Sequence, residues 1–347
     1  MVCLEMTGIL NLSRKAFFIC IFLLAAVLLV ACDRPDPQPA DSADAELQSS
    51  EQLAPDVDIT IEPESRIVLV TGATGTQGGA VARELLHRGY HVRGLTRDPQ
   101  SEQSLALEAE GALMVRGDYD DPISMADAMK DADAVFAVTL FWHGGYDAEV
   151  QHGKMLIDMA ETSGIEHFVL TSVAGADDST GIPHFESKWE VEQYLHQSDL
   201  NWTVIRPVEF MDNWGWSLEN FRQGRLVDPR NPESAHQWIA ARDIGYFVAE
   251  ALDGPGQWLG VTKEIAGDQL TLSELQGVLA GAFDRDFEHV QPSWDEFESE
   301  MGEEITEMYR WFENEGYAVD IDELRESHPN LQTASEFLFD LAGSSTD

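Results

Sequence analysis

An apolar segment that runs into regularly spaced glycines constrains the fold of this chain more than any other feature. Residues 67–70 are all aliphatic, and three glycines follow before a helical pattern begins: Gly72, Gly75 and Gly78. In a strand-to-helix turn, glycine allows the tight bend, the close approach of a ligand to the backbone, and close packing of the helix on its strand. The N–H groups that open the helix attract anions. The segment therefore predicts a nucleotide-binding turn, with a glycine turn that serves packing alone as the alternative.

The expected ligand of this turn is a dinucleotide, because a helical pattern to about residue 88 and a second apolar strand from residue 90 follow it. Three more residues of the turn are expected to contact the ligand: Thr74, Thr76 and Gln77.

The end of the second strand bears on which nicotinamide dinucleotide is bound. A carboxylate at this place accepts a hydrogen bond from the ribose 2′-hydroxyl of NAD(H), whereas a guanidinium pairs with the 2′-phosphate of NADP(H). Arg97 occupies the strand end, and Asp98 follows it. The sequence therefore favours NADP(H) over NAD(H), with Asp98 facing the ribose as the alternative.

Apolar strands and helical segments alternate along the chain to about residue 207. Further strands are expected at residues 112–115, 134–138, 167–172 and 202–206, and helices at residues 123–129, 147–163 and 183–196. Continuous apolar strands separated by helices are typical of a parallel sheet covered on both faces. We expect an α/β protein with a Rossmann-like doubly wound parallel sheet over about residues 66–207 and a smaller C-terminal lobe over about residues 208–345. Acidic amphipathic helices in this lobe, at residues 294–315 and 321–326, are expected to turn their charged faces to solvent.

The charge balance of the chain limits its partners. Asp and Glu number 63 against 21 Lys and Arg, which gives a formal net charge of -42. A field of this sign repels polyphosphates, so we do not expect nucleic acid as a partner. An acidic, lysine-poor surface is typical of proteins that work in concentrated salt, where repulsion between like charges is screened. We therefore expect a halophilic source.

The N-terminal residues resemble a bacterial lipoprotein signal. Arg14 and Lys15 precede an apolar run over residues 16–31, and Cys32 follows in a sequence similar to a lipobox. The run is short for a spanning helix, which needs about 20 residues. We expect residues 1–32 to be a signal peptide and Cys32 to be lipidated, which anchors the protein to a membrane in the cell envelope. An uncleaved anchor that leaves the domain on the cytoplasmic face is the alternative.

The segment after this signal has a different composition. Residues 33–65 are rich in Pro, Asp, Ser, Gln and Ala without an apolar period, which is typical of a disordered acidic tether. The other two cysteines, Cys3 and Cys20, lie within the expected signal. We therefore expect neither a disulfide framework nor a cysteine metal site in the domain, and no other metal ligands are assigned.

Several motifs together resemble the NmrA-like family of atypical short-chain dehydrogenase/reductase relatives. They are the glycine turn, Thr96-Arg97-Asp98-Pro99, Gly117-Asp118, His184-Phe185-Glu186-Ser187-Lys188, Arg206-Pro207, and motifs between Met308 and Pro329. The resemblance covers roughly residues 66–340. It implies a Rossmann-like fold that binds NAD(P)(H). Members of the family include redox sensors or regulators, and reductases of small substrates such as quinones.

The resemblance also implies catalytic positions. Hydride-transferring relatives place a tyrosine four residues before a lysine on one helical face, and the tyrosine protonates a carbonyl. Here Lys188 is present, as catalytic residue and ribose ligand, whereas His184 stands in the tyrosine's place. Ser172, at the end of the fifth strand, matches the serine that polarises the carbonyl. His184 is expected to act as an acid, since imidazole titrates near neutral pH, or else to serve packing or capping.

Loops beyond the carboxyl ends of strands carry the remaining cofactor contacts that the resemblance implies. They are Asp118, Tyr119, Thr139, Phe141, Trp142, Phe210 and Asn213. Five aromatic residues are expected either to wall an apolar pocket over the nicotinamide or to pack the core between sheet and lobe: Phe141, Trp142, Phe210, Trp214 and Trp216.

Two functions of different classes follow from these residues. The first is a redox-responsive sensor or regulatory binding module that meets a protein partner through its C-terminal lobe, and it is favoured by His184 in place of tyrosine. The alternative is an NAD(P)H-dependent reductase of a quinone or other small carbonyl acceptor, and it is favoured by Ser172, Lys188 and the aromatic residues.

Overall fold

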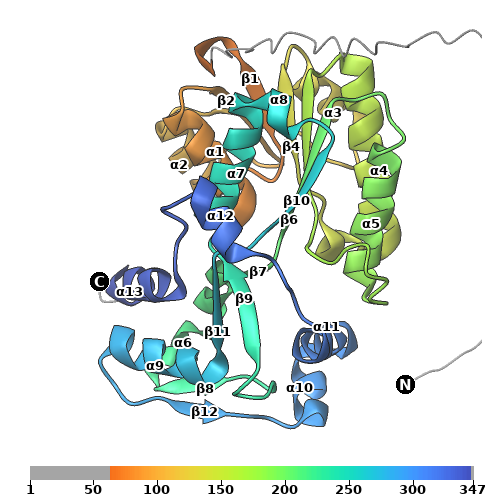
Figure 1. The fold of residues 1–347 in the computed structure, drawn as a ribbon. Helices are drawn as coiled ribbons and strands as arrows, with labels where there is room; N and C mark the ends of the chain where they lie inside the picture. The colour runs from red at the N-terminus through yellow and green to blue at the C-terminus, as the bar shows by residue number, and fades with distance from the viewer. Residues whose placement is uncertain (1–62, 345–347) are drawn as a thin grey trace, which may run out of the picture. The chain divides into compact units, whose positions relative to one another are not determined.

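The computed structural model describes residues 63–344, and its core is a seven-stranded sheet (Figure 1). The strands follow the order β10-β6-β5-β4-β1-β2-β3, and all neighbours are parallel. Their bounds are β1 (Ile67–Val70), β2 (His91–Thr96), β3 (Leu113–Arg116), β4 (Ala134–Ala137), β5 (His167–Thr171), β6 (Trp202–Pro207) and β10 (Val261–Ile265). β2 and β3 follow on one side of β1, and β4, β5 and β6 follow on its other side. The strand order therefore reverses between β1 and β4, and the crevice of a doubly wound fold lies at the carboxyl ends of these two strands. The expected α/β class and Rossmann-like doubly wound parallel sheet are confirmed.

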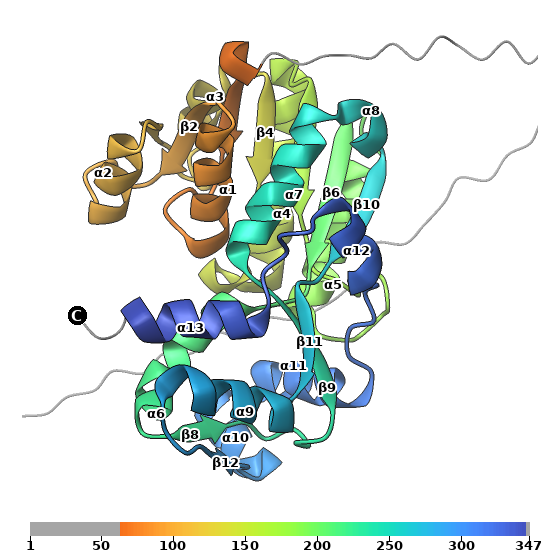
Figure 2. The same cartoon turned by 60° about the vertical axis from the view of Figure 1, so that its left-hand side comes forward.

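Helices cover both faces of this sheet, as Figures 1 and 2 show. One face carries α1 (Thr76–His87), α2 (Glu102–Ala109), α7 (Ala241–Asp253) and α12 (Ile321–Ser327), and the other carries α3 (Pro122–Met129), α4 (Gly145–Ser163) and α5 (Pro183–Leu195). Side chains of a strand alternate between the two faces. In β1, Val68 and Val70 join the apolar cluster beneath α1 and α7, whereas Leu69 joins the cluster beneath α4.

The smaller lobe is built on two small sheets, β11-β9-β7 and β12-β8. Their strands are β7 (Glu209–Phe210), β8 (Arg225–Val227), β9 (Ala235–Ile239), β11 (Asp268–Thr271) and β12 (Glu288–Val290). The helices of the lobe are α6 (Leu218–Arg222), α9 (Leu272–Phe283), α10 (Trp294–Met301), α11 (Glu303–Asn314) and α13 (Ala334–Ser344). The lobe has an apolar cluster of its own, in which Trp238 is fully buried.

The chain does not pass from core to lobe at a single boundary near residue 208. After β9 it returns to the large sheet, where α7 packs on α1, a short helix α8 (Pro255–Trp258) follows, and β10 pairs with β6. The close packing of α7 on α1 depends on Gly245, because an added Cβ there would lie 2.8 Å from Ala80 O. The sequence did not predict β10, since polar residues at positions 262–264 interrupt its apolar pattern at the sheet edge.

The strands and helices expected to residue 207 agree with the structure to within about two residues at each end. The exception is α2, which was not expected because it buries only Ser104 and Leu107 and so lacks a clear apolar stripe.

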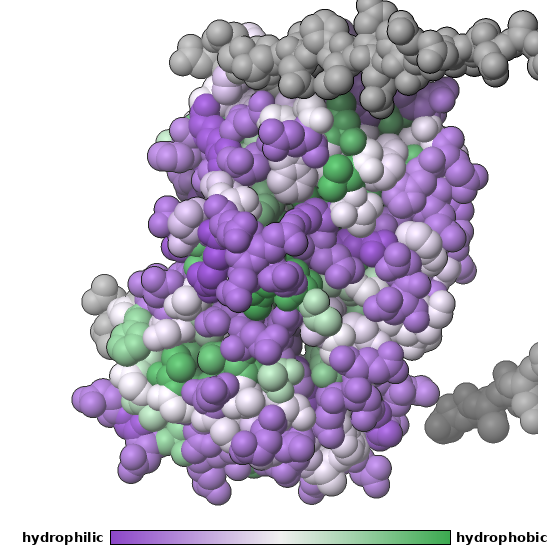
Figure 3. Space-filling model, viewed as in Figure 1, coloured by the Kyte–Doolittle hydropathy of each residue, from purple (hydrophilic) through white to green (hydrophobic). Residues whose placement is uncertain are grey.

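The expected signal peptide, the lipidated Cys32 and most of the tether over residues 33–65 lie outside the described residues. The last residues of that segment, Pro63–Ser65, form a short 3-10 helix. Within residues 63–344, no helix is both long and apolar enough to cross a membrane. Hydrophilic residues cover most of the face that Figure 3 shows, as a strongly acidic composition implies.

Candidate functional site

The glycine turn joins β1 to α1 and leaves the start of the helix open. Gly72 has a φ of +60°, and Gly75 N donates to Gly72 O over 2.9 Å to close the turn. A Cβ added to Gly78 would lie 2.7 Å from Thr71 O, so glycine is needed for α1 to start this close to β1. Gly75 caps α1 without a side-chain hydrogen bond, and the first turn holds no acidic residue. The geometry suits an anion at this helix N-terminus.

The other predicted residues of the turn divide into two groups. Thr74 and Thr76 are exposed. Gln77 is engaged by the protein, because its Nε2 donates to Thr171 Oγ1 at the end of β5 over 2.6 Å. A cavity of about 540 Å³ opens beside Thr76, between α1 and the start of α7. Gln77 therefore fixes α1 against the sheet, and the threonines remain accessible.

The sheet register places Thr139 and Ser172 on neighbouring strand ends. Ala137 of β4 pairs with Leu170 of β5, and on the other side of β5 Ser172 N donates to Ile205 O of β6 over 2.8 Å. Two residues beyond the Ala137–Leu170 pair, Thr139 and Ser172 fall on the face that carries α4 and α5. Ser172 is buried, and its Oγ has no hydrogen-bond partner among the described residues. Because buried hydroxyls are nearly always paired, this one has a hydrogen bond to spare.

A buried carboxylate of α4 holds Lys188. The Nζ of Lys188 donates to Glu149 Oε1 over 2.7 Å and to Thr139 Oγ1 over 3.3 Å. Glu149 is fully buried, and it also accepts hydrogen bonds from Thr139 Oγ1, over 2.7 Å, and from Ser187 Oγ. Burial raises the pKa of Glu149, but Lys188 and the two hydroxyls outweigh burial and hold the pKa below its ordinary value. An ammonium has three donors, so Lys188 keeps one for a ligand.

His184 lies one helical turn before Lys188 and reaches the smaller lobe. Its Nδ1 is 2.7 Å from Glu304 Oε1 of α11. Its ring contacts Phe141 and Trp142, at centroid distances of 5.6 and 5.4 Å. Burial lowers the pKa of His184, Glu304 raises it and Lys188 lowers it, and the net effect is a decrease. The surroundings of the ring therefore favour its uncharged form.

Arg97 and Asp98 have different surroundings at the end of β2. Asp98 Oδ1 accepts from Gln100 N over 2.9 Å, so this carboxylate closes its own turn. Arg97 is exposed, and its Nη1 lies 2.9 Å from Nε2 of His143, in the loop after β4. Arg97 therefore extends toward the loop after β4, whereas Asp98 is held within its own turn.

Asp118 and Tyr119, predicted cofactor contacts, order the loop after β3. Asp118 Oδ1 accepts from Asp120 N over 3.1 Å. Tyr119 OH donates to Val138 O over 2.6 Å, and burial raises the pKa of Tyr119 to about 12. Tyr119 thus joins the loops that follow β3 and β4, directly before Thr139.

The five aromatic residues do not form one wall. Trp214 is buried in the smaller lobe, with its ring centroid 5.5 Å from that of Trp238, which is the core packing given as the alternative. Trp216 is 87% exposed. Phe210 is half-buried against the core, and Asn213 is half-buried in the 3-10 helix that follows β7. Phe141 and Trp142 are the members that reach His184.

Three residues of the site were not predicted: Glu149, Glu304 and His143. The sequence does contain a signal for the burial of Glu149, because this residue falls on the apolar stripe of its helix with Gly153, Leu156 and Ala160. The sequence contains no such signal for Glu304, since 120 residues separate it from His184 and its helix is rich in exposed acidic residues. The charged faces of α10 and α11 were expected to face solvent, and Glu304 departs from that expectation.

Comparisons with known proteins agree with this fold. The NmrA-like family profile matches residues 64–338. An NAD(P)H azoreductase of Xenophilus azovorans is 31% identical to the chain, over 65% of this chain and 76% of that protein.

Solved structures are similar at lower identity. The triphenylmethane reductase of Citrobacter sp., complexed with NADP(H), has a TM-score of 0.69 at 20% identity, covering 80% of this chain and 99% of that one. NmrA, a negative transcriptional regulator, in complex with NADP has a TM-score of 0.68 at 20% identity, covering 81% of this chain and 96% of that one. NmrA has also been solved in complex with NAD. Because the family profile spans most of the sequence, the chain belongs to the NmrA-like family.

Proposed function

We propose that this chain is an NAD(P)H-dependent reductase of a quinone or related small carbonyl acceptor. The observation that carries the proposal is the buried hydroxyl of Ser172, which has no partner among the described residues. It lies on the strand end next to Thr139, which is hydrogen-bonded to Lys188. A carbonyl oxygen of a substrate would accept the unused hydrogen bond.

The residues fit a nicotinamide dinucleotide. The uncapped start of α1, with glycines that admit no Cβ, suits a pyrophosphate. The free donor of Lys188 suits a ribose hydroxyl. When bound, a reduced dinucleotide supplies a hydride. Relatives named as an NAD(P)H azoreductase and a triphenylmethane reductase lend this function further support.

The side chains of the chain then have separate roles in this proposal. Ser172 polarises the acceptor oxygen by donating a hydrogen bond. Lys188, fixed by Glu149, orients the ribose and keeps a positive charge beside the reacting oxygen. His184 supplies the proton that a tyrosine supplies in other hydride-transferring relatives. The exposed face of Trp142, 67% accessible and next to His184, suits a planar acceptor.

Binding and turnover test the proposal together. Titration of purified protein with NADPH should give saturable binding, and a panel of quinones and azo dyes should accelerate NADPH oxidation. Ser172→Ala should lower kcat by about 10-fold or more while leaving the Kd for NADPH unchanged, because the hydroxyl acts on the acceptor. Binding without turnover of any acceptor would contradict the reductase.

We propose that NADP(H) is preferred over NAD(H) because Arg97 extends from its turn while Asp98 does not. Arg97→Ala should raise the Kd for NADPH by about 10-fold, the worth of a charge-assisted hydrogen bond, and leave the Kd for NADH nearly unchanged. Arg116→Ala, at the exposed end of β3, is the matched control. Equal weakening of NADPH and NADH would contradict the preference.

A sensor or regulatory module is the second candidate. One observation favours it: the hydrogen bond from His184 to Glu304 ties the predicted cofactor site directly to the smaller lobe. A change at the site would pass to the lobe and from there to a protein partner. NADPH-dependent protection of α11 from hydrogen exchange, together with absence of turnover, would support this function over the reductase.

We propose in addition that Cys32 carries a lipid and that a membrane anchor holds the domain in the cell envelope of a halophile, as the N-terminal pattern and the acidic composition favour. In a bacterial host, Cys32→Ser should abolish lipid labelling and release the protein from membranes. Protease treatment of intact cells would distinguish this location from the cytoplasmic face.

A further inference from the structure

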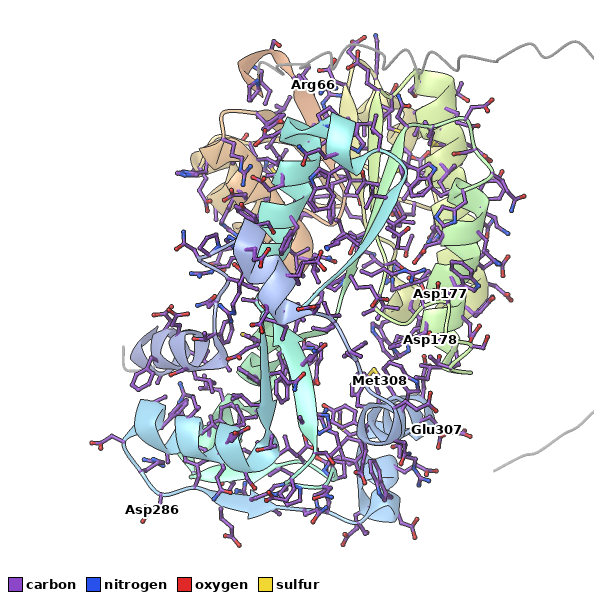
Figure 4. All side chains as sticks on the ribbon, in the orientation of Figure 1. Arg66, Asp177, Asp178, Asp286, Glu307 and Met308 are labelled. Carbon is purple, nitrogen blue, oxygen red and sulfur yellow. The ribbon has the colours of Figure 1, made fainter. Side chains whose placement is uncertain are left out.

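Helix α11 of the smaller lobe brings a carboxylate to the site. Glu304 Oε1 lies 2.7 Å from His184 Nδ1, and the two side chains are 25% and 11% exposed. In Figure 4, Glu307 and Met308 of the same helix lie close to Asp177 and Asp178, in the loop that leads to α5. The lobe therefore contacts the segment that carries His184.

Apolar packing holds α11 in this place. Trp311 and Phe312 of α11 form a buried cluster with Ile182 and Phe185, which flank His184. An added Cβ at Gly175 would lie 3.2 Å from the ring of Trp311, so the loop before α5 approaches the helix closely. The packed interface around Trp311 and Phe312 therefore fixes where α11 lies, and with it the position of Glu304.

The charged groups around His184 come from three helices: Glu304 from α11, Lys188 from α5 itself and Glu149 from α4. Burial and Lys188 favour the neutral imidazole, whereas the two carboxylates favour the protonated one. A neutral imidazole next to a carboxylate donates Nδ1–H to it, which leaves Nε2 as the nitrogen that exchanges a proton.

We propose that Glu304 is a positioning residue for His184: it fixes the ring and its tautomer, so that Nε2 delivers the proton during reduction of the acceptor. This inference rests on the proposed reductase function. A carbonyl or quinone takes up one hydride, from the reduced nicotinamide, and one proton. The neutral ring first takes a proton from solvent on Nε2, which the adjacent Glu304 carboxylate favours. The imidazolium then gives that Nε2 proton to the acceptor oxygen as the hydride arrives, and the ring returns to its neutral form with Nδ1–H on Glu304.

The first measurement needs no cofactor. The pKa of His184 is followed by NMR of its imidazole C–H signals in the wild-type protein and in Glu304→Gln. Loss of the carboxylate should lower the pKa of His184 further, because Glu304 raises it. Glu303→Gln, the same change at the exposed first residue of α11, should leave that pKa unchanged. A pKa that does not respond to Glu304→Gln would overturn the inference.

The second measurement uses turnover. Glu304→Gln should lower kcat by about 10-fold and move the pH profile of kcat to lower pH, with the Kd for NADPH unchanged, since a general acid contributes about 10²–10⁴ in total. Glu304→Asp should restore part of the loss, and circular dichroism should show both variants folded. If the wild type is active and its pH profile of kcat is the same in Glu304→Gln, the inference is overturned. Failure of the wild type to reduce any acceptor would instead remove the proposed function, and the NMR measurement separates the two failures.

Discussion

At the scale of single residues, the candidate site depends on a carboxylate and an ammonium that share a buried position. Glu149 is fully buried and the side chain of Lys188 is 16% exposed, and the carboxylate accepts three hydrogen bonds, from Lys188, Thr139 and Ser187. Buried charges are tolerated only when they are paired and hydrogen-bonded. Groups of this kind cluster at functional sites, and this one lies where the strands end.

We predict that Glu149→Gln destabilises the protein by roughly 3–5 kcal/mol at pH 7, because it leaves the largely buried Lys188 without its counter-charge. Urea denaturation measures the change. Glu190→Gln is the control, since Glu190 pairs with Lys154 over 2.6 Å at a partly exposed position and should cost about 0–1 kcal/mol. Equal costs for the two variants would contradict the role of the buried pair.

Glu149→Gln should also change how the free energy of unfolding depends on pH. The pKa of Glu149 is lowered in the folded state, so its contribution to the free energy of unfolding is present above the ordinary value of 4.5 and is lost as pH falls below it. Glu149→Gln should remove that part of the acid destabilisation.

We predict opposite effects for one substitution at two glycines. Gly78→Ala places a Cβ 2.6 Å from Gly72 C, and overpacking of this kind costs about 1–3 kcal/mol. Dinucleotide binding should weaken with it, since the turn must shift. Gly277→Ala, inside α9, meets no described atom within 4 Å and should stabilise the protein by about 0.5–1 kcal/mol. Thermal melting and NADPH titration measure both, and a neutral Gly78→Ala would contradict the close turn.

At the scale of elements, neighbouring strands of the large sheet are joined by buried polar contacts as well as by their ladders. His167 of β5 is buried, and its Nε2 lies 2.8 Å from Thr203 Oγ1 of β6. Burial, with a smaller contribution from Arg66, lowers the pKa of His167 to about 4. The imidazole is neutral in the folded protein and becomes protonated more readily once the sheet opens.

We predict that this histidine contributes to acid lability. Its folded pKa is depressed, so the stabilisation is present above the ordinary pKa of 6.5 and is lost as pH falls from 6.5 toward 4. His167→Gln should flatten the fall in unfolding free energy over that range, by up to about 3 kcal/mol. His91→Gln, exposed at the start of β2, should leave the slope as in the wild type. An unchanged slope in His167→Gln would refute the assignment.

At the scale of the whole molecule, the sum of charges opposes the compact state. A formal net charge of -42 produces self-repulsion that acts over about 10 Å at 0.1 M salt and about 3 Å at 1 M. Paired groups such as Arg206 with Glu192 are too few to cancel it, since acids exceed bases three to one. Screening by salt should therefore favour the folded protein.

We predict that Tm rises by about 5 °C between 0.1 and 1 M KCl, as screening of like charges adds roughly 1–3 kcal/mol of stability. Sucrose, which is excluded from the surface but does not screen, is the control and should have the smaller effect at equal concentration. Unfolding in strong salt, with full stability in dilute buffer, would count against a protein adapted to salt.

Much of the fold follows from short-range pattern. The glycine turn, the apolar strands and the helices between them are properties of neighbouring residues, so the sequence sufficed to predict six of the sheet's strands and its doubly wound class. Ser172, His184 and Lys188 were selected by the resemblance to the NmrA-like family, which a sequence can carry because a strand end and an i, i+4 pair on one helix are local relations. The site functions of these residues stay predictions.

Tertiary structure alone decided which groups meet. Glu149 reaches Lys188 across 39 residues and Glu304 reaches His184 across 120, and in each case the contact depends on how helices pack. The edge strand β10 likewise pairs with β6, a strand far from it in the sequence, after the chain has returned to the large sheet through α7. Local pattern determines the elements, whereas the protonation of the site depends on burial and on charges that only the assembled fold brings within reach.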